Sequence, residues 1–362
     1  MYNDRIYNFS AGPSMLPLEV LEQAASEMTN YNGSGMSVAE MSHRSKVFQA
    51  IFDQTITDFS RIMDVPEGYK VLFLQGGATL QFAMAPMNLI KKTGKADYAI
   101  TGNFSNNAYK EALKYGEINI AANSKDKNHT YIPAQSDIKI SPDASYFYYC
   151  SNNTVYGTEW SYVPETGDVS IVCDMSSNIL SKPVDISKYG ILFAGAQKNM
   201  APAGVTVVIV KEDILGYEMD LTPTMMSYQK MIDKDSMYNT PPCFNIYMLG
   251  LVLKWLDKQG GVKGMEEIKS NKASIIYNFL DDSEMFSACA EKGSRSDMNV
   301  TFVTGDPDLD AKFIKEAGDS GFANLKGHRS VGGMRASIYN AMPVAGVEKL
   351  VEFMKAFEVK NI

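Results

Sequence analysis

A lysine and an aspartate each stand at the end of a short apolar run. Asp174 ends the run Ser170–Asp174, and Lys198 follows the run that begins at Ile191, twenty-four residues after Asp174. A lysine amine can form a Schiff base with an aldehyde cofactor, and a carboxylate beside a pyridine nitrogen keeps that ring protonated and electron-withdrawing. The pair therefore predicts a pyridoxal phosphate site. For an arbitrary pair, a solvated lysine and a strand-ending carboxylate would be the better interpretation.

The surrounding pattern places this pair among parallel strands. Short runs rich in Val, Ile, Phe and Tyr alternate with longer helical patterns, which is typical of βαβ units. The runs lack apolar–polar alternation, as expected when helices cover both faces of a sheet. The predicted strands are Lys70–Leu74, Asp97–Thr101, Tyr146–Cys150, Ser170–Cys173, Gly190–Phe193 and Val205–Val210, and the predicted helices between them are Val38–Met63, Thr79–Leu89 and Asn107–Lys114. The expected fold class is α/β.

The length of 362 residues exceeds the size at which a single core usually stops growing, so two domains are expected. An apolar helix over Phe244–Lys258 ends at Gln259–Gly261, which is a helix stop, and the pattern changes after it. We predict a large domain over 15–258 and a small α/β domain over 259–362 that includes the N-terminal segment 1–14. Its predicted elements are Val262–Leu280, Met298–Val303, Ala311–Ala317, Phe322–Leu325, Met334–Ser337 and Val344–Phe357.

Composition excludes several classes of protein. The hydrophobic share of 45% and the charged share of 21% are those of a globular protein, and no apolar run is long enough for a membrane span or an export signal. A net charge of −8 argues against nucleic-acid binding, and three scattered histidines argue against a protein-ligated metal. Four cysteines without a pairing pattern indicate buried thiols in a reducing cytoplasm.

Three further positions suit a planar, phosphorylated cofactor. Gly76 and Gly77 follow a strand and open a helix near Thr79, where free amides could hold a phosphate, although such turns use glycine without a ligand about as often. The turn is neither GxGxxG nor a Walker motif, which weakens nucleotide and nicotinamide alternatives. Phe104, just past a strand end, could stack on a ring or simply pack in the core. Thr154 could hydrogen-bond a ring hydroxyl.

Two histidine–arginine pairs suggest an anion site. His43 precedes Arg44, and His328 precedes Arg329 far along the chain. Arginine presents a planar fork to phosphate or carboxylate, and histidine adds a switchable charge, whereas two solvated polar loops are the alternative. Arg335 begins a strand between small residues and could clamp a substrate α-carboxylate, with a buried structural ion pair as the competing use.

These segments, in this order, resemble those of the phosphoserine aminotransferases, a family in the class V branch of the fold-type-I pyridoxal phosphate enzymes. The resemblance runs nearly end to end and implies a large domain with a mostly parallel seven-stranded sheet covered by helices, plus a smaller C-terminal α/β domain. The segments that carry it are Tyr7–Pro13, Met41–Ser45, Gln75–Ala78, Gly195–Asn199, Tyr238–Pro242, Gly327–Arg329 and Gly332–Asn340.

The resemblance also implies residue roles. Lys198 would bind the cofactor covalently, Asp174 would pair with its pyridinium, Phe104 would stack on its ring and Thr154 would hydrogen-bond it. Its phosphate would be held by Ala78, Thr79, Gln197 and, from the neighbouring subunit of a homodimer, Asn239 and Thr240. Arg335 would clamp the α-carboxylate, while the distal phosphate or carboxylate would meet His43, Arg44, His328 and Arg329. The chain departs from some family members at Phe104, often a tryptophan, and at Thr79, an arginine in others.

The implied reaction is a reversible amino transfer from glutamate to 3-phosphohydroxypyruvate, giving 2-oxoglutarate and O-phospho-L-serine with ping-pong kinetics. This is a step of serine biosynthesis. The same family also forms 4-phosphohydroxy-L-threonine on the route to pyridoxine, and the sequence does not separate the two substrates.

Rival interpretations begin with another class V enzyme, such as an alanine–glyoxylate aminotransferase or a cysteine desulfurase. A desulfurase would need a reactive cysteine, and only Lys292 is placed to activate Cys289. A catalytically silent binding protein and a cofactor-free Schiff-base lyase are also open, although both would leave Asp174 and the glycine turn without a task.

Overall fold

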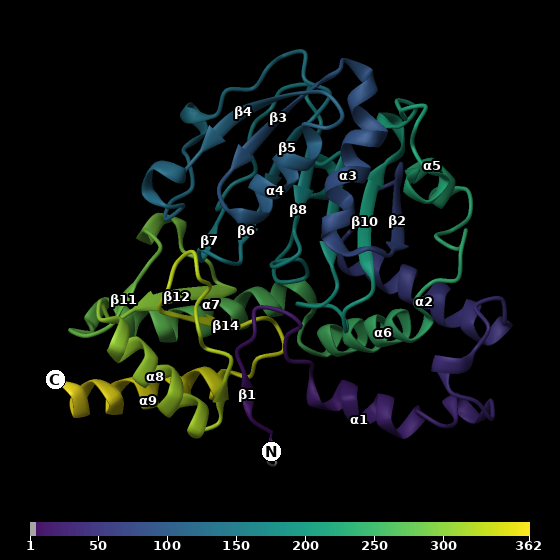
Figure 1. The fold of residues 1–362 in the computed structure, drawn as a ribbon. Helices are drawn as coiled ribbons and strands as arrows, with labels where there is room; N and C mark the ends of the chain where they lie inside the picture. The colour runs from purple at the N-terminus through teal and green to yellow at the C-terminus, as the bar shows by residue number, and fades with distance from the viewer. Residues whose placement is uncertain (1–4) are drawn as a thin grey trace.

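A seven-stranded sheet forms one half of the molecule (Figure 1), in a computed structural model that describes residues 5–362. Strand β10 is antiparallel to both of its neighbours, and all other neighbouring strands pair in parallel. The six strands other than β10 therefore run in the same direction. The expected mostly parallel α/β sheet is confirmed. In spatial order its strands are β2 (Tyr69–Leu74), β10 (Thr206–Lys211), β9 (Ile191–Gly195), β8 (Ile171–Asp174), β5 (Phe147–Cys150), β3 (Lys95–Ile100) and β4 (Glu117–Asn123).

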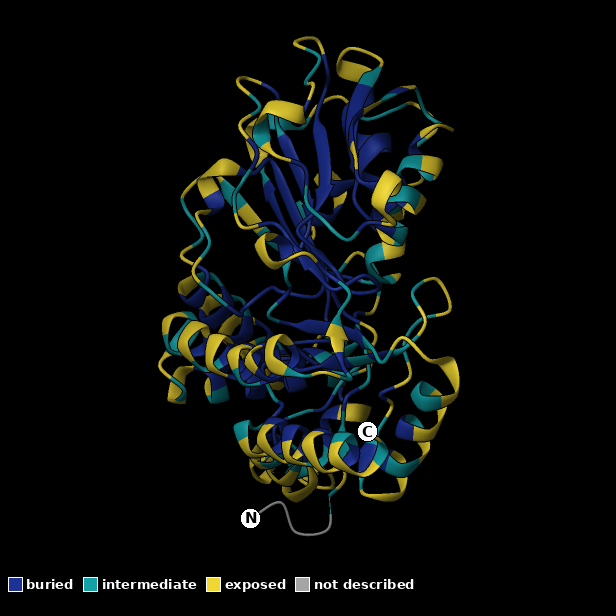
Figure 2. Cartoon of the chain, turned by 90° about the vertical axis from the view of Figure 1, so that its left-hand side faces the viewer, coloured by how far each residue is buried: buried dark blue, intermediate teal, exposed yellow. Residues whose placement is uncertain are grey.

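Helices cover both faces of this sheet, and successive strand residues pack to opposite sides. Cys173 and Leu192 join the core formed with α1 (Leu18–Glu27), α2 (Lys46–Ile62) and α6 (Cys243–Lys258). Val172 and Phe193 join the core formed with α3 (Gly77–Leu89), α4 (Asn103–Ala112) and α5 (Tyr228–Ile232). Figure 2 shows the strands buried and the outer faces of the helices exposed. Burial on both faces explains the uninterrupted apolar runs.

A second, smaller sheet lies below the first in Figure 1. It consists of β11 (Ser287–Ala288), β12 (Asn299–Val303) and β14 (Met334–Ser337), all antiparallel. Nearby, β1 (Tyr7–Asn8) pairs with β13 (Phe322–Ala323). The core here includes Phe9 and Met15 together with residues of α7 (Gly261–Asp282), α8 (Pro307–Asp319) and α9 (Val344–Asn361). The domain limits proposed above stay a prediction, and residues 1–4 lie outside the described part.

Several predicted elements differ in extent. The helix expected over Val38–Met63 is a 3-10 turn at Val38–Glu40 followed by α2, because Ser45 caps α2 by accepting from the Phe48 amide at 3.1 Å. The edge strand β4 was not predicted. Its exposed and buried residues are mixed, so it lacks the apolar run of the central strands. Within residues 5–362, no helix is long and apolar enough to cross a bilayer.

Candidate active site

A cavity of about 670 Å³ lies where β5, β8 and β9 reach their carboxyl ends. Ligands of open α/β sheets bind at these strand ends. The small sheet contributes Arg335 from β14, and the loop before β14 contributes His328 and Arg329. Ten of the fourteen predicted site residues line this one cavity: Ala78, Thr79, Phe104, Thr154, Asp174, Gln197, Lys198, His328, Arg329 and Arg335.

Lys198 lies in the connection between β9 and the reversed strand β10. Its side chain is buried, its Nζ donates to Thr154 Oγ1 at 2.6 Å, and Nζ lies 5.5 Å from the centre of the Phe104 ring. The N-terminal segment fixes the main chain here, since the Ser14 amide donates to the Gln197 carbonyl at 2.9 Å and the Ser14 hydroxyl bonds the Lys198 carbonyl. The amine is therefore aimed into the cavity from an anchored backbone.

Asp174 ends β8 with its carboxylate buried beside the cavity. The Ser176 amide donates to Asp174 Oδ1 at 2.9 Å, and the Ser176 hydroxyl accepts from the Gly195 amide at 3.1 Å. Burial raises the pKa of Asp174, and the Ser176 bonds and the charge of Lys198 oppose that rise. No ion pair to Asp174 occurs within residues 5–362, so its negative charge is available to a ligand cation or N–H.

The turn before α3 requires glycine. Gly76 has φ +87°, and a Cβ there would lie 2.5 Å from Leu80 Cδ2, so both the backbone and the space exclude a side chain. Gly77, Ala78 and Thr79 then begin α3 and line the cavity. The amides of a helix's first turn have no intrahelical acceptor, which makes this end of α3 suited to a phosphate.

Besides Lys198, the mouth of the cavity carries three cationic residues, Arg329, Arg335 and Lys110, with His328 among them, while Asp174 is the one carboxylate among the lining residues. Burial is the main cause that lowers the pKa of Arg335, whose Nη1 donates to the Thr154 carbonyl at 3.2 Å and whose buried Nε has no partner within the described chain. Burial, with the charges of Arg335 and Arg329, also lowers the pKa of His328. This excess of positive charge suits a ligand with several anionic groups.

Four predicted residues do not line this cavity. His43 is half-buried and Arg44 is exposed, both just before α2. Asn239 and Thr240 lie before α6, where the Thr240 carbonyl accepts from Gln75 Nε2 at 3.3 Å. Within one chain, the structure does not bring these four to Lys198.

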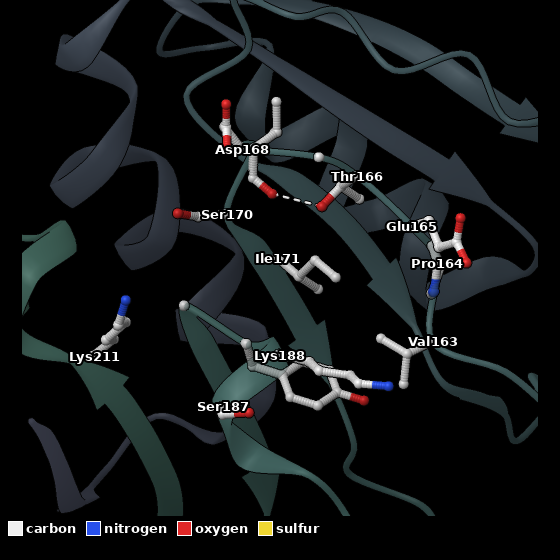
Figure 3. Close-up of a pocket in the computed structure, with 14 residues that line it drawn as sticks. Val163, Pro164, Glu165, Thr166, Asp168, Ser170, Ile171, Ser187, Lys188 and Lys211 are labelled. Carbon is white, nitrogen blue, oxygen red and sulfur yellow. Dashed lines mark hydrogen bonds between the residues drawn. The ribbon is translucent and has the colours of Figure 1, made fainter. Parts of the chain in front are cut away.

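A second cavity, of about 460 Å³, lies at the opposite end of the sheet (Figure 3). Ser170 and Ile171 bring the start of β8 to it, and Lys211 brings the end of β10. Its Thr166 hydroxyl bonds the Val169 carbonyl at 2.6 Å. None of the predicted site residues lines this second cavity, so the cavity of Lys198 and Asp174 is the candidate active site.

Comparison with known proteins agrees with this geometry. The family model described as "Aminotransferase class-V" matches residues 6–350. The chain belongs to the class-V aminotransferase family. It is 49% identical to a phosphoserine aminotransferase of Janthinobacterium sp. (strain Marseille), over 98% of this chain and 99% of that one. It is 52% identical to one of Nitrosomonas europaea, over 98% of each.

Solved structures extend the match to the fold. A phosphoserine aminotransferase from Bacillus circulans subsp. alkalophilus superposes with a TM-score of 0.97 at 45% identity, over 99% of this chain and 100% of that one. A pyridoxal-phosphate-bound phosphoserine aminotransferase from Trichomonas vaginalis gives 0.93 at 39% identity, over 97% and 100%. The resemblance drawn from the motifs is confirmed. This class-V aminotransferase is a pyridoxal-phosphate-dependent transaminase, which sets aside the silent binding protein and the cofactor-free lyase.

The lining residues of this class-V aminotransferase fit that cofactor. A buried carboxylate without an ion-pair partner suits the pyridinium, the partly exposed Phe104 (38% exposed) offers a ring for stacking, and the first turn of α3 suits the phosphate. Lys198 is the one lysine buried at the base of the cavity, since Lys110 is exposed on α4. The roles of the individual residues stay predictions.

The sequence analysis missed several lining residues, including Lys110, Asn152, Ser176 and Ser177. Ser176 and Ser177 follow Asp174 by two and three residues, so their closeness to a strand-ending acid was a usable signal. Asn152 Nδ2 donates at 2.8 Å to both Ser177 Oγ and Asn299 Oδ1, which joins the cavity floor to the small sheet. That contact links segments far apart in the chain and left no sequence pattern.

Proposed function

We propose that this aminotransferase transfers an amino group between glutamate and 3-phosphohydroxypyruvate, forming 2-oxoglutarate and O-phospho-L-serine. Two observations carry the proposal: the full-length relatives are phosphoserine aminotransferases, and the mouth of the cavity holds Arg329, Arg335 and Lys110 beside His328. Both amino acids carry an α-carboxylate and a second anion, and an alanine-specific site would have no use for the extra cations. The proposed place of the reaction is serine biosynthesis.

The proposed roles start at the base of the cavity. Lys198 would hold the cofactor covalently until an amino acid displaces it, and its freed amine would then carry a proton from the substrate Cα. Pyridoxal phosphate, when bound, withdraws electrons from that carbon. Asp174 would keep the pyridine nitrogen protonated, because the negative charge of a buried carboxylate stabilises a neighbouring pyridinium cation. Phe104, Thr154, Gln197, Ala78 and Thr79 would orient the ring and phosphate.

Thr154 is placed to serve two partners. Its hydroxyl accepts from Lys198 Nζ at 2.6 Å, and its carbonyl accepts from Arg335 Nη1 at 3.2 Å. A substrate whose α-carboxylate pairs with Arg335 would therefore have its Cα near the lysine amine. The unpartnered Nε of Arg335 supports this, because a buried guanidinium N–H without an acceptor is costly and a carboxylate would supply one.

The distal anion would meet His328, Arg329 and Lys110. These side chains come from a loop and a helix rather than from one rigid strand, and each anion requires charge more than one exact shape. The same set would receive the carboxylate of glutamate in one half-reaction and a phosphate in the other. Lys110 supplies a cation in a chain that has Thr79 where some family members have arginine.

The four residues outside the cavity support a homodimer with shared sites. We propose that a second copy of the chain supplies Asn239 and Thr240 to the cofactor phosphate, and that His43 and Arg44 reach the distal anion only in that assembly. The proposed location is the cytoplasm, to which the four free cysteines, Cys150, Cys173, Cys243 and Cys289, are suited.

The proposed anion site would also accept the four-carbon homologue whose product is 4-phosphohydroxy-L-threonine. The two substrates keep the same α-carboxylate and phosphate and differ by one hydroxylated carbon. Values of kcat/KM measured side by side for the two amino acids decide which one the enzyme prefers.

An absorbance spectrum tests the proposed function. Protein loaded with pyridoxal phosphate is mixed with O-phosphoserine, glutamate or alanine. We expect phosphoserine and glutamate to convert the yellow lysine-bound form to the aminated form, and alanine to leave it unchanged. Conversion by alanine as fast as by phosphoserine would favour an alanine–glyoxylate enzyme, and no colour after incubation with the cofactor would contradict the proposal.

A further inference from the structure

A buried lysine holds the segment Ile338–Met342, which follows β14. Lys272 lies on α7 with a fully buried side chain, and its Nζ donates to the carbonyl oxygens of this segment. The distances are 3.0 Å to Ile338, 2.7 Å to Tyr339, 3.4 Å to Asn340 and 3.0 Å to Met342. No carboxylate forms an ion pair with Lys272 within residues 5–362.

The same segment contacts the walls of the cofactor cavity. The Tyr339 hydroxyl donates to the Ala11 carbonyl at 2.7 Å, and Ala11 lines the cavity. The Asn340 amide donates to Asn199 Oδ1 at 3.0 Å, and Asn199 directly follows Lys198. The segment thus connects the N-terminal wall with the side chain of Asn199, the residue next to the cavity's lysine, on the side where β14 presents Arg335.

An ammonium group suits this arrangement of carbonyl oxygens. It carries three N–H donors without an acceptor, so it can satisfy several carbonyl oxygens that converge on one point. Burial lowers the pKa of Lys272 to about 7, while hydrogen bonds to carbonyl oxygens favour its charged form. Without the ammonium, the converging carbonyl dipoles would repel one another and lose their partners, so the segment would have to rearrange.

We propose that Lys272 is a positioning residue of the aminotransferase: it fixes the segment Ile338–Met342, which in turn holds Ala11 and the Lys198–Asn199 main chain in register with Arg335. The lysine touches neither cofactor nor substrate, and its effect on catalysis is transmitted through Tyr339 and Asn340. The inference rests on the proposed cofactor site.

The test compares two buried lysines of α7 in the cofactor-loaded protein. Lys272→Met keeps most of the apolar stem and removes every donor to the segment. Lys269→Met is the matched control, because Lys269 is also buried, one turn earlier, but its Nζ binds Asp297 Oδ2 at 2.8 Å and not the segment. For each variant we would measure Tm, the cofactor Kd, kcat, KM and amide hydrogen exchange around Ala11, Asn199 and Tyr339.

For Lys272→Met we expect kcat to fall and the cofactor Kd to rise, each by about ten-fold or more, because small displacements of reacting groups are costly. Exchange should quicken at Ala11, Asn199 and Tyr339 rather than throughout the chain. Lys269→Met should lower Tm while leaving kcat, Kd and exchange at those three sites within about two-fold of the wild type.

Equal changes in kcat and Kd for the two variants, or a Lys272→Met enzyme with wild-type values, would overturn the proposal. If Lys272→Met does not fold, Lys272→Gln against Lys269→Gln is judged by the same criteria, since glutamine retains two donors at a shorter reach. Wild-type protein that binds no pyridoxal phosphate would instead contradict the proposed function, and the hydrogen-exchange comparison would still decide whether Lys272 holds the segment.

Discussion

Lys198 and Thr154 are joined by a 2.6 Å hydrogen bond that links the turn after β9 to the chain after β5. Because the Thr154 carbonyl also accepts from Arg335, one residue spaces the amine and the guanidinium. The distance between the group that would move a proton and the group that would bind the substrate carboxylate is therefore set by the side-chain hydroxyl and the main-chain carbonyl of a single buried residue.

Replacing Lys198 by alanine tests the covalent role. Lys198→Ala removes the amine that would bind the cofactor and transfer the proton, so kcat should fall by at least about 1,000-fold. Pyridoxal phosphate should still bind noncovalently and show no lysine-bound absorbance band. The measurement is kcat together with an absorbance spectrum, and wild-type activity would remove Lys198 from the mechanism.

Asp174→Asn tests the carboxylate. A neutral amide cannot stabilise a pyridinium, while the Ser176 amide still finds an oxygen acceptor, so the fold should survive. We expect the cofactor Kd to rise about ten-fold and proton abstraction to slow, in line with the loss of a charge-assisted hydrogen bond. Both are measured by cofactor titration and by exchange of the substrate Cα proton. Unchanged values would place the cofactor ring elsewhere.

Lys110→Met tests a cation that the family resemblance did not indicate. The value of kcat/KM for O-phosphoserine should fall about ten-fold, mainly through KM, because a charged contact to the distal phosphate is lost. Alanine should still leave the lysine-bound form unchanged. The control is Lys114→Met, since Lys114 lies just beyond α4, pairs with Glu111 at 2.6 Å and does not line the cavity. Equal effects of the two substitutions would contradict the role of Lys110.

Mixing two inactive variants tests the shared site. In a homodimer whose sites are completed in trans, a mixed dimer contains one chain with Lys198→Ala and one chain with Asn239→Ala and Thr240→Ala. The unaltered Lys198 of the second chain and the unaltered Asn239 and Thr240 of the first then form one intact site. After unfolding and refolding together, the mixture should regain about a quarter of the wild-type activity, since half of the dimers are mixed and each has one working site. No recovery in a mixture shown to contain mixed dimers would mean that each chain builds its own site.

A buried acid should govern stability at low pH. Glu159 accepts from Lys182 Nζ at 2.9 Å and from Asn178 Nδ2 at 3.1 Å. Burial alone would raise its pKa, but the charges of Lys182 and Lys269 and these bonds outweigh burial, and the pKa lies below the ordinary value of 4.5. A lowered folded-state pKa gives stability that is present above 4.5 and is lost as the pH falls through the folded value.

Glu159→Gln should therefore reduce the free energy of unfolding at pH 7 by about 3 kcal/mol, because it leaves Lys182 without its anion. The deficit relative to the wild type should shrink as the pH falls below 4.5. Urea unfolding of both proteins across that pH range measures the deficit in the free energy of unfolding. A deficit that stays constant with pH would contradict the lowered pKa of Glu159.

The sequence predicted the base of the site better than its mouth. Asp174 and Lys198 follow strands buried on both faces, whose apolar runs are visible without a structure. Lys110 was not predicted because the helix was placed from Asn107, whereas α4 begins at Asn103. A helix that begins at Asn103 places Phe104, Asn107 and Lys110, which are three residues apart, on one face toward the cavity.

Long-range contacts account for the rest. The four carbonyls bound by Lys272 lie 66 to 70 residues farther along the chain, and nothing in the local pattern of α7 distinguishes this lysine from its neighbours. Likewise, His43 and Arg44 were indicated by their histidine–arginine pairing, and Asn239 and Thr240 by resemblance, and the positions of all four outside the cavity follow from tertiary packing.

The reversed direction of β10 limits how the reactive lysine can move. Its connection to β9 is held at both ends by adjacent central strands. The Ser14 amide bonds the Gln197 carbonyl of this connection, and the Asn340 amide bonds the Asn199 side chain. The backbone of Lys198 therefore cannot swing as a lid would. The amine must therefore move by rotations about its own four methylene groups, so in the proposed mechanism it reaches only atoms within the radius of one extended side chain.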